Sequence, residues 1–202
     1  MTKAARGRSD AGTAGRILDT AERLAQMRGF NGFSYADVAL ELGITKAALH
    51  YHFAGKADLG EALIGRYAVR FGEALAAIDA SGVPAPARLR GYADLYLGVL
   101  QDERMCLCGM LAAEYPTLPP AMRTAVISFF DENEKWLQHV LEQGRDDGSL
   151  QFTGPARDVA RMIIGCLEGA MLVARPYGEP PRVQDAAESL VAGLTSPLTA
   201  RD

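Results

Sequence analysis

Two short helices joined by a tight turn are predicted within residues 34–56, SYADVALELGITKAALHYHFAGK, and this stretch constrains the fold more than any other. Ser34 suits the N-cap of the first helix, because its hydroxyl can accept a hydrogen bond from an otherwise unpaired N–H of the first turn. Gly43 ends that helix, since glycine adopts the left-handed conformation without a Cβ penalty. Thr45 is placed to cap the second helix. Helix, glycine turn and helix together indicate a helix-turn-helix motif.

The second helix of this motif presents two chemically different faces. Apolar side chains at helical spacing point inward along both helices. The outward face carries Lys46, Ala47, His50 and Tyr51, which offer a cation, hydrogen-bond donors and a small residue where a base edge can approach. A recognition helix in a DNA major groove needs these properties. A helical hairpin inside a larger bundle is the alternative that this pattern leaves open.

The run TKAALHYHFAGKADL, residues 45–59, resembles the DNA-binding end of TetR-family transcriptional repressors. In that family a hydrophobic residue, an aromatic pair, His-Phe, a short loop, Lys and Leu close the motif and begin a long fourth helix. The resemblance covers residues 13–63. It departs at His50, where the family usually has a tyrosine that often contacts phosphate, and Tyr51 is the candidate to take over that contact. The matching residues are Leu49, Tyr51, His52, Phe53, Lys56 and Leu59.

This resemblance implies a repressor with a double-stranded DNA operator as its partner. Lys46 is expected to read a base or its adjacent phosphate, whereas Tyr51 and Lys56 are expected to position the sugar–phosphate backbone. Residues 1–60 hold eight Lys or Arg and six Asp or Glu, for a net charge of +2, and the remainder has −6. The sign of this asymmetry favours DNA binding at the N-terminal end. The candidate DNA-binding residues are Arg16, Ser34, Tyr35, Thr45, Lys46, Ala47, His50, Tyr51 and Lys56.

The rest of the chain predicts helices and no strands, so we expect an all-α fold of about nine helices. A three-helix, helix-turn-helix DNA-binding domain with its N-terminal arm is expected at residues 1–56. A helical ligand-binding and dimerisation domain is expected at 57–202. The polar residues 1–12 are expected to form a disordered arm. Further helices are predicted at residues 13–28, 57–80, 88–103, 106–115, 121–143, 155–175 and 182–193.

Aromatic and sulfur-containing side chains concentrate in the predicted fifth to seventh helices, with few charges on their inner faces. Such a lining suits a small, mostly apolar effector held by one or two polar contacts. Ordinary core packing is the alternative interpretation. Glu114 is the expected polar member of this pocket. The candidate pocket residues are Tyr92, Tyr96, Met110, Glu114, Phe129 and Trp136.

The predicted helix at residues 155–175 is apolar on nearly every side, which is typical of a helix buried on both sides. Arg161 and Glu168 interrupt it and exclude a membrane span. Gly165 and Gly169 leave a groove in which another helix can approach closely. With the final helix it resembles the C-terminal pair through which TetR-type proteins form homodimers. The candidate interface residues are Met162, Cys166, Gly169, Ala170, Val173 and Leu190.

Catalytic and cofactor motifs are missing from the sequence, so neither an enzyme nor a bound cofactor or metal is expected. His50 and His52 are two residues apart and face different ways on a helix, so they cannot jointly hold a metal. Cys106 and Cys108 are spaced too closely for a usual zinc half-site, and packing, redox sensing and metal binding stay open for them. The sequence shows neither an apolar run of about 18 residues nor an N-terminal signal core, which indicates a cytoplasmic protein.

These features predict a ligand-responsive, DNA-binding transcriptional repressor that binds a palindromic operator as a homodimer. One alternative is an all-α small-molecule-binding protein or enzyme without a role on DNA. The other is a thiol-based, redox-sensing regulator that uses Cys106 and Cys108.

Overall fold

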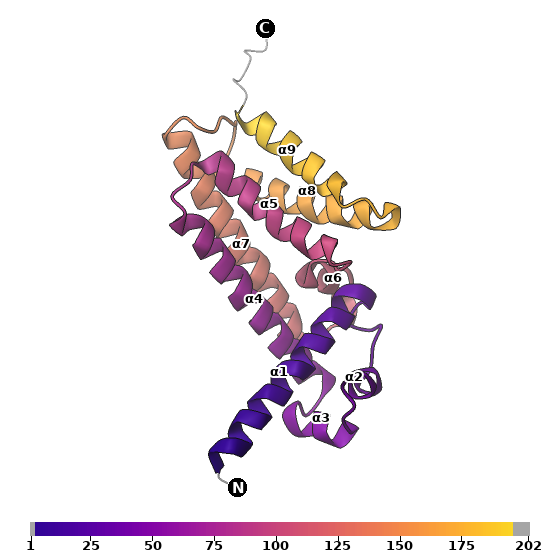
Figure 1. Ribbon diagram of the computed structural model, residues 1–202. Helices are drawn as coiled ribbons and strands as arrows, with labels where there is room; N and C mark the ends of the chain where they lie inside the picture. The colour runs from indigo at the N-terminus through magenta and orange to yellow at the C-terminus, as the bar shows by residue number, and fades with distance from the viewer. Residues whose placement is uncertain (1–2, 196–202) are drawn as a thin grey trace. The chain divides into compact units, whose positions relative to one another are not determined.

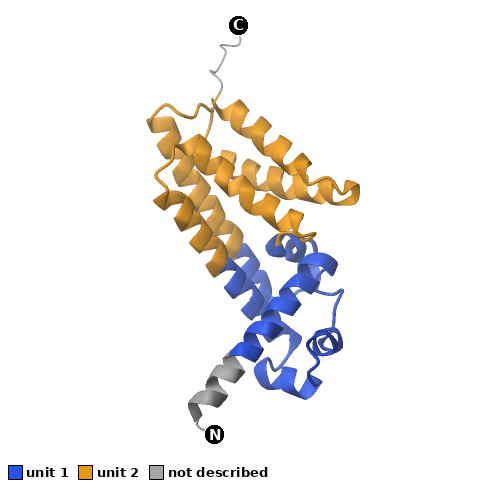
Figure 2. Cartoon of the chain, in the orientation of Figure 1, with its two compact units in different colours: residues 1–68, 107–127 blue, residues 69–106, 128–202 orange. Residues whose placement is uncertain are grey.

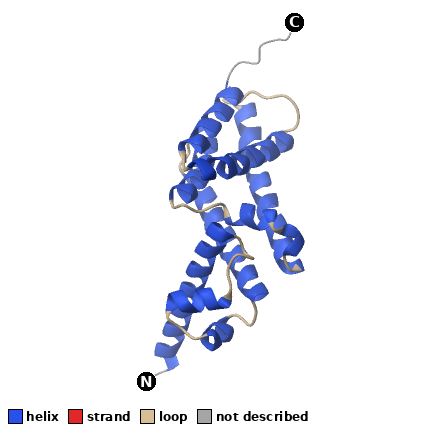
Figure 3. Cartoon of the chain, turned by 90° about the vertical axis from the view of Figure 1, so that its right-hand side faces the viewer, coloured by secondary structure: helices blue, strands red, loops and turns tan. Residues whose placement is uncertain are grey.

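The computed structural model describes residues 3–195, with side chains described from residue 12 onward. Helices and connecting loops make up this described part, which contains no strand (Figures 1 and 3). The expected all-α fold is therefore confirmed there. No helix among the described residues is long and apolar enough to cross a bilayer. The elements are α1 (Lys3–Arg28), α2 (Tyr35–Leu42), α3 (Lys46–His52), α4 (Lys56–Ala80), α5 (Ala85–Gln101), α6 (Leu107–Ala113), η1 (Tyr115–Thr117), α7 (Pro120–Asp146), α8 (Ala156–Tyr177) and α9 (Pro181–Thr195).

Two segments that were expected to be irregular are helical. Helix α1 begins at Lys3, so the predicted disordered arm is wrong from that residue on, and residues 1–2 of this arm lie outside the described residues. The segment is rich in alanine and arginine, which favour helix, and it contains no proline. Helix α5 begins at Ala85, in the stretch between the helices predicted at residues 57–80 and 88–103. Pro84 is its N-cap and Pro86 lies in its first turn, where the fixed φ of proline suits a helix start.

The chain forms two compact units, shown in different colours in Figure 2. Unit 1 comprises Met1–Ala68 and Leu107–Ile127, and unit 2 comprises Val69–Cys106 and Ser128–Asp202. This division differs from the boundary drawn at residue 56 from the sequence, because α6, η1 and the start of α7 pack with the N-terminal helices. Helices α4 and α7 each contribute residues to both units.

Unit 1 is held by a buried apolar core and by ion pairs at its surface. Arg66 of α4 donates to Asp19 at 2.7 Å and to Glu22 at 2.9 Å, which ties α4 to α1. Arg23 of α1 pairs with both carboxylate oxygens of Glu41, which ties α1 to α2. These ties fix α1 against both neighbouring helices. The core side chains are Ile17, Ala21, Leu24, Val38, Leu49, Leu59 and Leu63.

Helices α5, α8 and α9 pack against one another in unit 2. One face of α8 is buried, through residues such as Ile163, Leu167 and Met171. The opposite face exposes Met162 and Val173, each by slightly more than half of its surface. The single chain covers only one of the two apolar faces of α8, so burial on both sides stays a prediction that depends on a partner helix.

Candidate nucleic-acid interface

The helix-turn-helix motif is defined by three local interactions that the sequence predicts. Ser34 Oγ accepts a hydrogen bond from the Asp37 N–H at 3.4 Å, and the Asp37 carboxylate accepts one from the Ser34 N–H at 2.7 Å, which completes a capping box. Gly43 has φ +64°, the left-handed conformation that ends α2. Thr45 Oγ1 accepts a hydrogen bond from the Ala48 N–H at 3.1 Å and caps α3. The predicted caps of both helices are confirmed.

Helix α3 turns one side chain into the core and four outward. Leu49 is fully buried and anchors the helix. Lys46, Ala47, His50 and Tyr51 are exposed, with 74 % of the Tyr51 surface accessible to solvent. An exposed face with a cation, an imidazole, a phenol and a small residue has the groups needed to contact phosphates and base edges.

His50 closes the end of α3 and retains one ring nitrogen for another partner. Its Nδ1 lies 3.0 Å from the Ala54 carbonyl oxygen, and its ring packs 4.8 Å from the Tyr35 ring between centroids. A carbonyl oxygen only accepts hydrogen bonds, so Nδ1 carries the proton and Nε2 is left for another contact. The sequence left the role of His50 open, and the structure gives it a part in shaping the loop after α3.

Ser34 and Tyr35 form hydrogen bonds within the helix-turn-helix region. Their expected contacts with DNA stay predictions. The Ser34 hydroxyl lies 2.6 Å from Asp37 Oδ2 in addition to its capping bond. The Tyr35 hydroxyl donates to the Phe53 carbonyl oxygen at 3.0 Å. Burial, with a smaller effect of the Asp58 charge, raises the pKa of Tyr35 to about 12, so its phenol is neutral at physiological pH.

The Lys56 ammonium is turned toward the protein rather than outward. It donates to the carbonyl oxygens of Phe30 and Phe33, and it lies over both rings, 4.6 Å and 4.4 Å from their centroids. Burial lowers its pKa, and the charges of Glu114 and Asp37 oppose that effect. An ammonium has three N–H donors, so one is left for a phosphate. The expected phosphate contact of Lys56 therefore stays a prediction that depends on this single donor.

Arg16 lies on an exposed part of α1. One guanidinium nitrogen reaches the Leu42 carbonyl oxygen at 3.5 Å, the long limit of a hydrogen bond. Most of its five N–H donors are not used by this contact. Arg16 therefore stays a candidate for a phosphate contact.

Four of the six candidate pocket residues meet in unit 2. The Tyr92 and Tyr96 hydroxyls are 3.0 Å apart, and the Tyr92 hydroxyl donates to Asn133 Oδ1 at 3.1 Å. The Trp136 ring stacks on the Tyr92 ring, with 5.6 Å between centroids. Phe129 joins the cluster through edge-to-face packing on Phe71, a ring that also contacts both tyrosines. We call Tyr92, Tyr96, Phe129 and Trp136 the aromatic cluster.

The other two candidate pocket residues, Met110 and Glu114, belong to unit 1. Met110 is half-buried on α6. The Glu114 carboxylate accepts hydrogen bonds from the backbone N–H groups of Phe30 and Asn31, at 2.7 Å and 3.3 Å. The carboxylate therefore binds the loop between α1 and α2. This role differs from the ligand-binding role expected from the sequence.

Glu168 of α8 is a polar residue of unit 2 that the sequence did not single out as functional. Its Oε1 is shielded from solvent, and no donor among the described residues reaches that atom. Burial raises the pKa of Glu168 from its ordinary value of 4.5 to about 7, and a hydrogen bond with Cys106 opposes the rise. Its charge also contributes to the raised pKa values of Tyr92 and Tyr96, behind the larger effect of burial. The sequence signal is a carboxylate within the mostly apolar stretch 162–173 of α8.

Cys106 and Cys108 are both buried. Buried thiols are less accessible to an oxidant than exposed ones, and Cys106 also forms a hydrogen bond with Glu168. No group of three His, Cys, Asp or Glu side chains within the described residues has the geometry to hold a metal ion.

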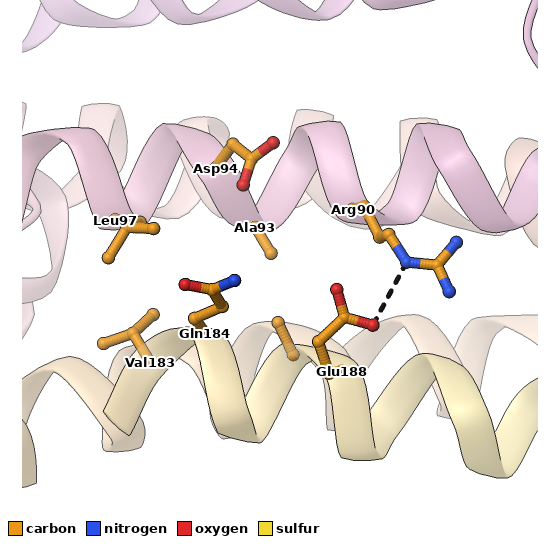
Figure 4. Close-up of a pocket in the computed structure, with 8 residues that line it drawn as sticks. Arg90, Ala93, Asp94, Leu97, Val183, Gln184 and Glu188 are labelled. Atoms are coloured by element: carbon orange, nitrogen blue, oxygen red, sulfur yellow. Dashed lines mark hydrogen bonds and ion pairs between the residues drawn. The ribbon is translucent and has the colours of Figure 1, made fainter. Parts of the chain in front are cut away.

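A groove with a volume of about 240 Å³ runs between α5 and α9, as Figure 4 shows. Arg90 and Glu188 form an ion pair of 3.2 Å across it, and both side chains are about half exposed. A second groove, of about 360 Å³, lies where the end of α5 meets the end of α8. Neither groove is lined by a candidate pocket residue.

The six candidate interface residues are exposed or half-buried in the single chain. Met162 and Val173 are exposed by 53 % and 54 %. The small residues Gly169 and Ala170 lie between them in sequence and are half-buried, so a second helix can approach there. Cys166 on α8 and Leu190 on α9 are also half-buried.

The capped helix pair, the buried anchor of α3 and its exposed polar face define a DNA-binding protein of the helix-turn-helix class. The family model described as "Bacterial regulatory proteins, tetR family" matches residues 17–63. A second, described as "Tetracyclin repressor-like, C-terminal domain", matches residues 85–190. The chain therefore belongs to the TetR family of bacterial transcriptional regulators, whose members bind DNA and are not enzymes.

Known relatives and solved structures agree with this assignment. A TetR-family regulator from Agrobacterium tumefaciens is 32 % identical, with a TM-score of 0.89 over 93 % of this chain and 100 % of that one. A TetR regulator from Legionella pneumophila is 31 % identical, with a TM-score of 0.81 over 89 % and 95 %. The repressor NemR of Escherichia coli is 25 % identical over 79 % of this chain and 82 % of its own length.

Proposed function

We propose that this protein is a ligand-responsive repressor that binds a palindromic operator as a homodimer. The observation that carries the proposal is helix α3, which is capped at Thr45 and anchored by buried Leu49, and which presents Lys46 and Tyr51 to solvent. The relative NemR is a transcriptional repressor, which supports repression rather than activation.

Retardation of DNA from the region upstream of the protein's own gene is the direct test. A dimer is expected to protect two half-sites, with centres about 34–36 Å apart for one helical turn. Specific binding exceeds non-specific binding by roughly 10³-fold or more. Affinity for the upstream DNA no greater than for random DNA of the same length would reject this operator.

Lys46→Ala is expected to lower operator affinity about ten-fold. The exposed Lys46 ammonium on the recognition helix is expected to contact a base or its adjacent phosphate, and alanine removes that contact. Stability should hardly change, since the side chain is exposed. Fluorescence anisotropy with labelled operator measures the effect. The matched control is Lys135→Ala, an exposed lysine of α7 paired with Glu132. Equal operator affinities for the two variants would show that Lys46 does not contribute to DNA binding.

We place the effector at the aromatic cluster of unit 2. The cluster combines apolar rings with the hydroxyls of Tyr92 and Tyr96, and Glu168 lies close enough to affect their titration. An apolar site with a few polar groups suits a small, mostly apolar molecule that carries a hydrogen-bond donor. Such an effector needs to prefer the state with low DNA affinity by only about 1–3 kcal/mol to act as an inducer.

A bound effector is expected to quench or shift the fluorescence of Trp136, the only tryptophan in the sequence. The indole stacks on Tyr92 and its Nε1 donates to Asp79 Oδ2 at 2.9 Å, so a molecule entering the cluster changes its surroundings. Titration of compounds that release operator DNA should show both changes with matching concentration dependence. A Trp136→Phe variant controls for absorption by the compound itself.

Thiol oxidation is the outcome that would replace this mechanism. Peroxide would then release operator from the wild type, while the Cys106→Ser, Cys108→Ser double variant would bind operator normally and ignore peroxide. That result would make the thiols the switch and would contradict the effector site at the aromatic cluster.

A further inference from the structure

The loop that joins α1 to α2 is gripped by a carboxylate from a distant part of the sequence. Glu114 directly follows α6, and its Oε2 accepts the Phe30 N–H at 2.7 Å. The Asn31 N–H lies 3.3 Å from both carboxylate oxygens. We call this arrangement of Glu114 with the N–H groups of Phe30 and Asn31 the Glu114 clamp. It lies wholly within unit 1.

The clamp leaves little room for a side chain at the preceding residue, which is glycine. Gly29 ends α1 with φ +85°, a conformation that other residues rarely adopt. A Cβ atom added to Gly29 would lie 2.6 Å from Glu114 Oε1, which is too close for any real contact. A side chain at position 29 would therefore displace the Glu114 carboxylate.

A second interaction from the same segment holds the same loop. Asn31 Nδ2 donates to Thr117 Oγ1 at 2.8 Å, and the Thr117 hydroxyl donates to the Glu114 carbonyl oxygen at 2.8 Å. Helices α1 and α6 also pack directly on each other. The segment from α6 to η1 thus forms a rigid support for the loop.

Lys56 holds the loop from the side of the helix-turn-helix. Its ammonium donates to the carbonyl oxygens of Phe30 and Phe33 and lies over both aromatic rings. Phe30 is therefore fixed twice, through its N–H by the anion Glu114 and through its carbonyl by the cation Lys56. Lys56 is the first residue of α4 and follows α3 by a short loop, so this contact fixes the chain immediately after the recognition helix.

We propose that Glu114 is a positioning residue for DNA recognition, which orders the α1–α2 loop and, through Phe30 and Lys56, the end of the recognition helix. The inference rests on the proposed operator binding. It makes the segment from α6 to η1 part of the DNA-reading machinery rather than of the effector pocket. Charge-assisted hydrogen bonds such as those of the clamp are stronger than neutral ones, which suits this ordering role.

The test compares Glu114→Gln and Glu114→Ala with Glu61→Gln, which removes a negative charge from an exposed position of α4 in the same unit. Operator affinity is measured against salt concentration, at a temperature where each variant is folded. Loss of a negative charge by itself favours binding to a polyanion, so Glu61→Gln should bind equally or more tightly. Loss of the clamp should act in the opposite direction.

Glu114→Ala is expected to weaken operator binding about ten-fold, and Glu114→Gln less, because the amide keeps one acceptor oxygen. The slope of affinity against salt should not change, since Glu114 contacts no phosphate. Amide NMR signals of Phe30 and Asn31 should shift in the Gln variant, together with those of α3. If Glu114→Ala does not fold, the Gln variant decides.

Binding by the Glu114 variants equal to or tighter than wild type, as for Glu61→Gln, would overturn the inference. NMR shifts confined to Phe30 and Asn31 would also overturn it, because the effect would then end at the loop. Wild-type protein that fails to recognise the upstream DNA would instead reject the proposed operator binding. The two failures are therefore distinguishable.

Discussion

Ala170→Arg is expected to convert the protein to a monomer and to weaken binding to a palindromic operator about 100-fold or more. The reason is the uncovered apolar face of α8, where Met162 and Val173 are each more than half exposed and Ala170 is half-buried. An arginine introduced there would bury an unpaired charge in an apolar contact, which is strongly unfavourable. Two half-sites bound by one dimer gain roughly 10²–10⁴ in avidity over one half-site.

Sedimentation velocity and operator anisotropy measure the two parts of this prediction. Affinity for a single half-site should not change, because the substitution lies in unit 2 and the helix-turn-helix lies in unit 1. Ala76→Arg, at an exposed position of α4, controls for the added charge. A variant that sediments as a dimer at micromolar concentration and holds the palindrome normally would exclude this face as the interface.

Glu168→Gln is expected to raise the free energy of unfolding by about 3 kcal/mol at pH 8 and by less than about 1 kcal/mol at pH 5. The cause is the buried carboxyl, whose pKa rises from 4.5 to about 7 in the folded protein. Between these two values the unfolded chain loses the proton while the folded chain keeps it. Ionisation therefore favours the unfolded state increasingly as pH rises through this window. Above about pH 7 the full penalty is present, and glutamine removes it.

Urea denaturation at a series of pH values, with protein concentration held constant, measures this difference. Glu188→Gln is the matched control, because Glu188 is an exposed carboxylate paired with Arg90. A stability difference for Glu168→Gln that is independent of pH would show that the carboxyl titrates normally in the folded protein. The energetic argument for a buried, destabilising carboxyl near the aromatic cluster would then fail.

The sequence by itself determined the helix-turn-helix and the all-helical fold. The caps at Ser34 and Thr45 and the turn at Gly43 depend on residues within about four positions of each other. Helical periodicity is local in the same way, so it located most of the later helices to within a few residues. The motif at residues 45–59 also indicated the family, and the family models confirm it.

The predicted starts of α1 and α5 were wrong. The predicted start of α5 at residue 88 is three residues late, because Pro84 and Pro86 lie at the start of that helix, where a proline lacks only an N–H that the first helical turn leaves unpaired. The polar residues before Thr13 continue α1 from Lys3, since polarity alone does not oppose a helix. Both errors concern where a helix begins, which depends on a balance of small local energies.

Only the tertiary structure decided what three charged residues do. Lys56 bonds to carbonyl groups 23 and 26 residues earlier, and Glu114 to N–H groups 83 and 84 residues earlier. Glu168 is a charged residue on an amphipathic helix until α8 packs and shields its carboxyl. No periodic pattern encodes such contacts, because they form only when distant segments fold together. Desolvation and hydrogen bonding then set the charge and partners of each group, and these follow from burial rather than from neighbours in the sequence.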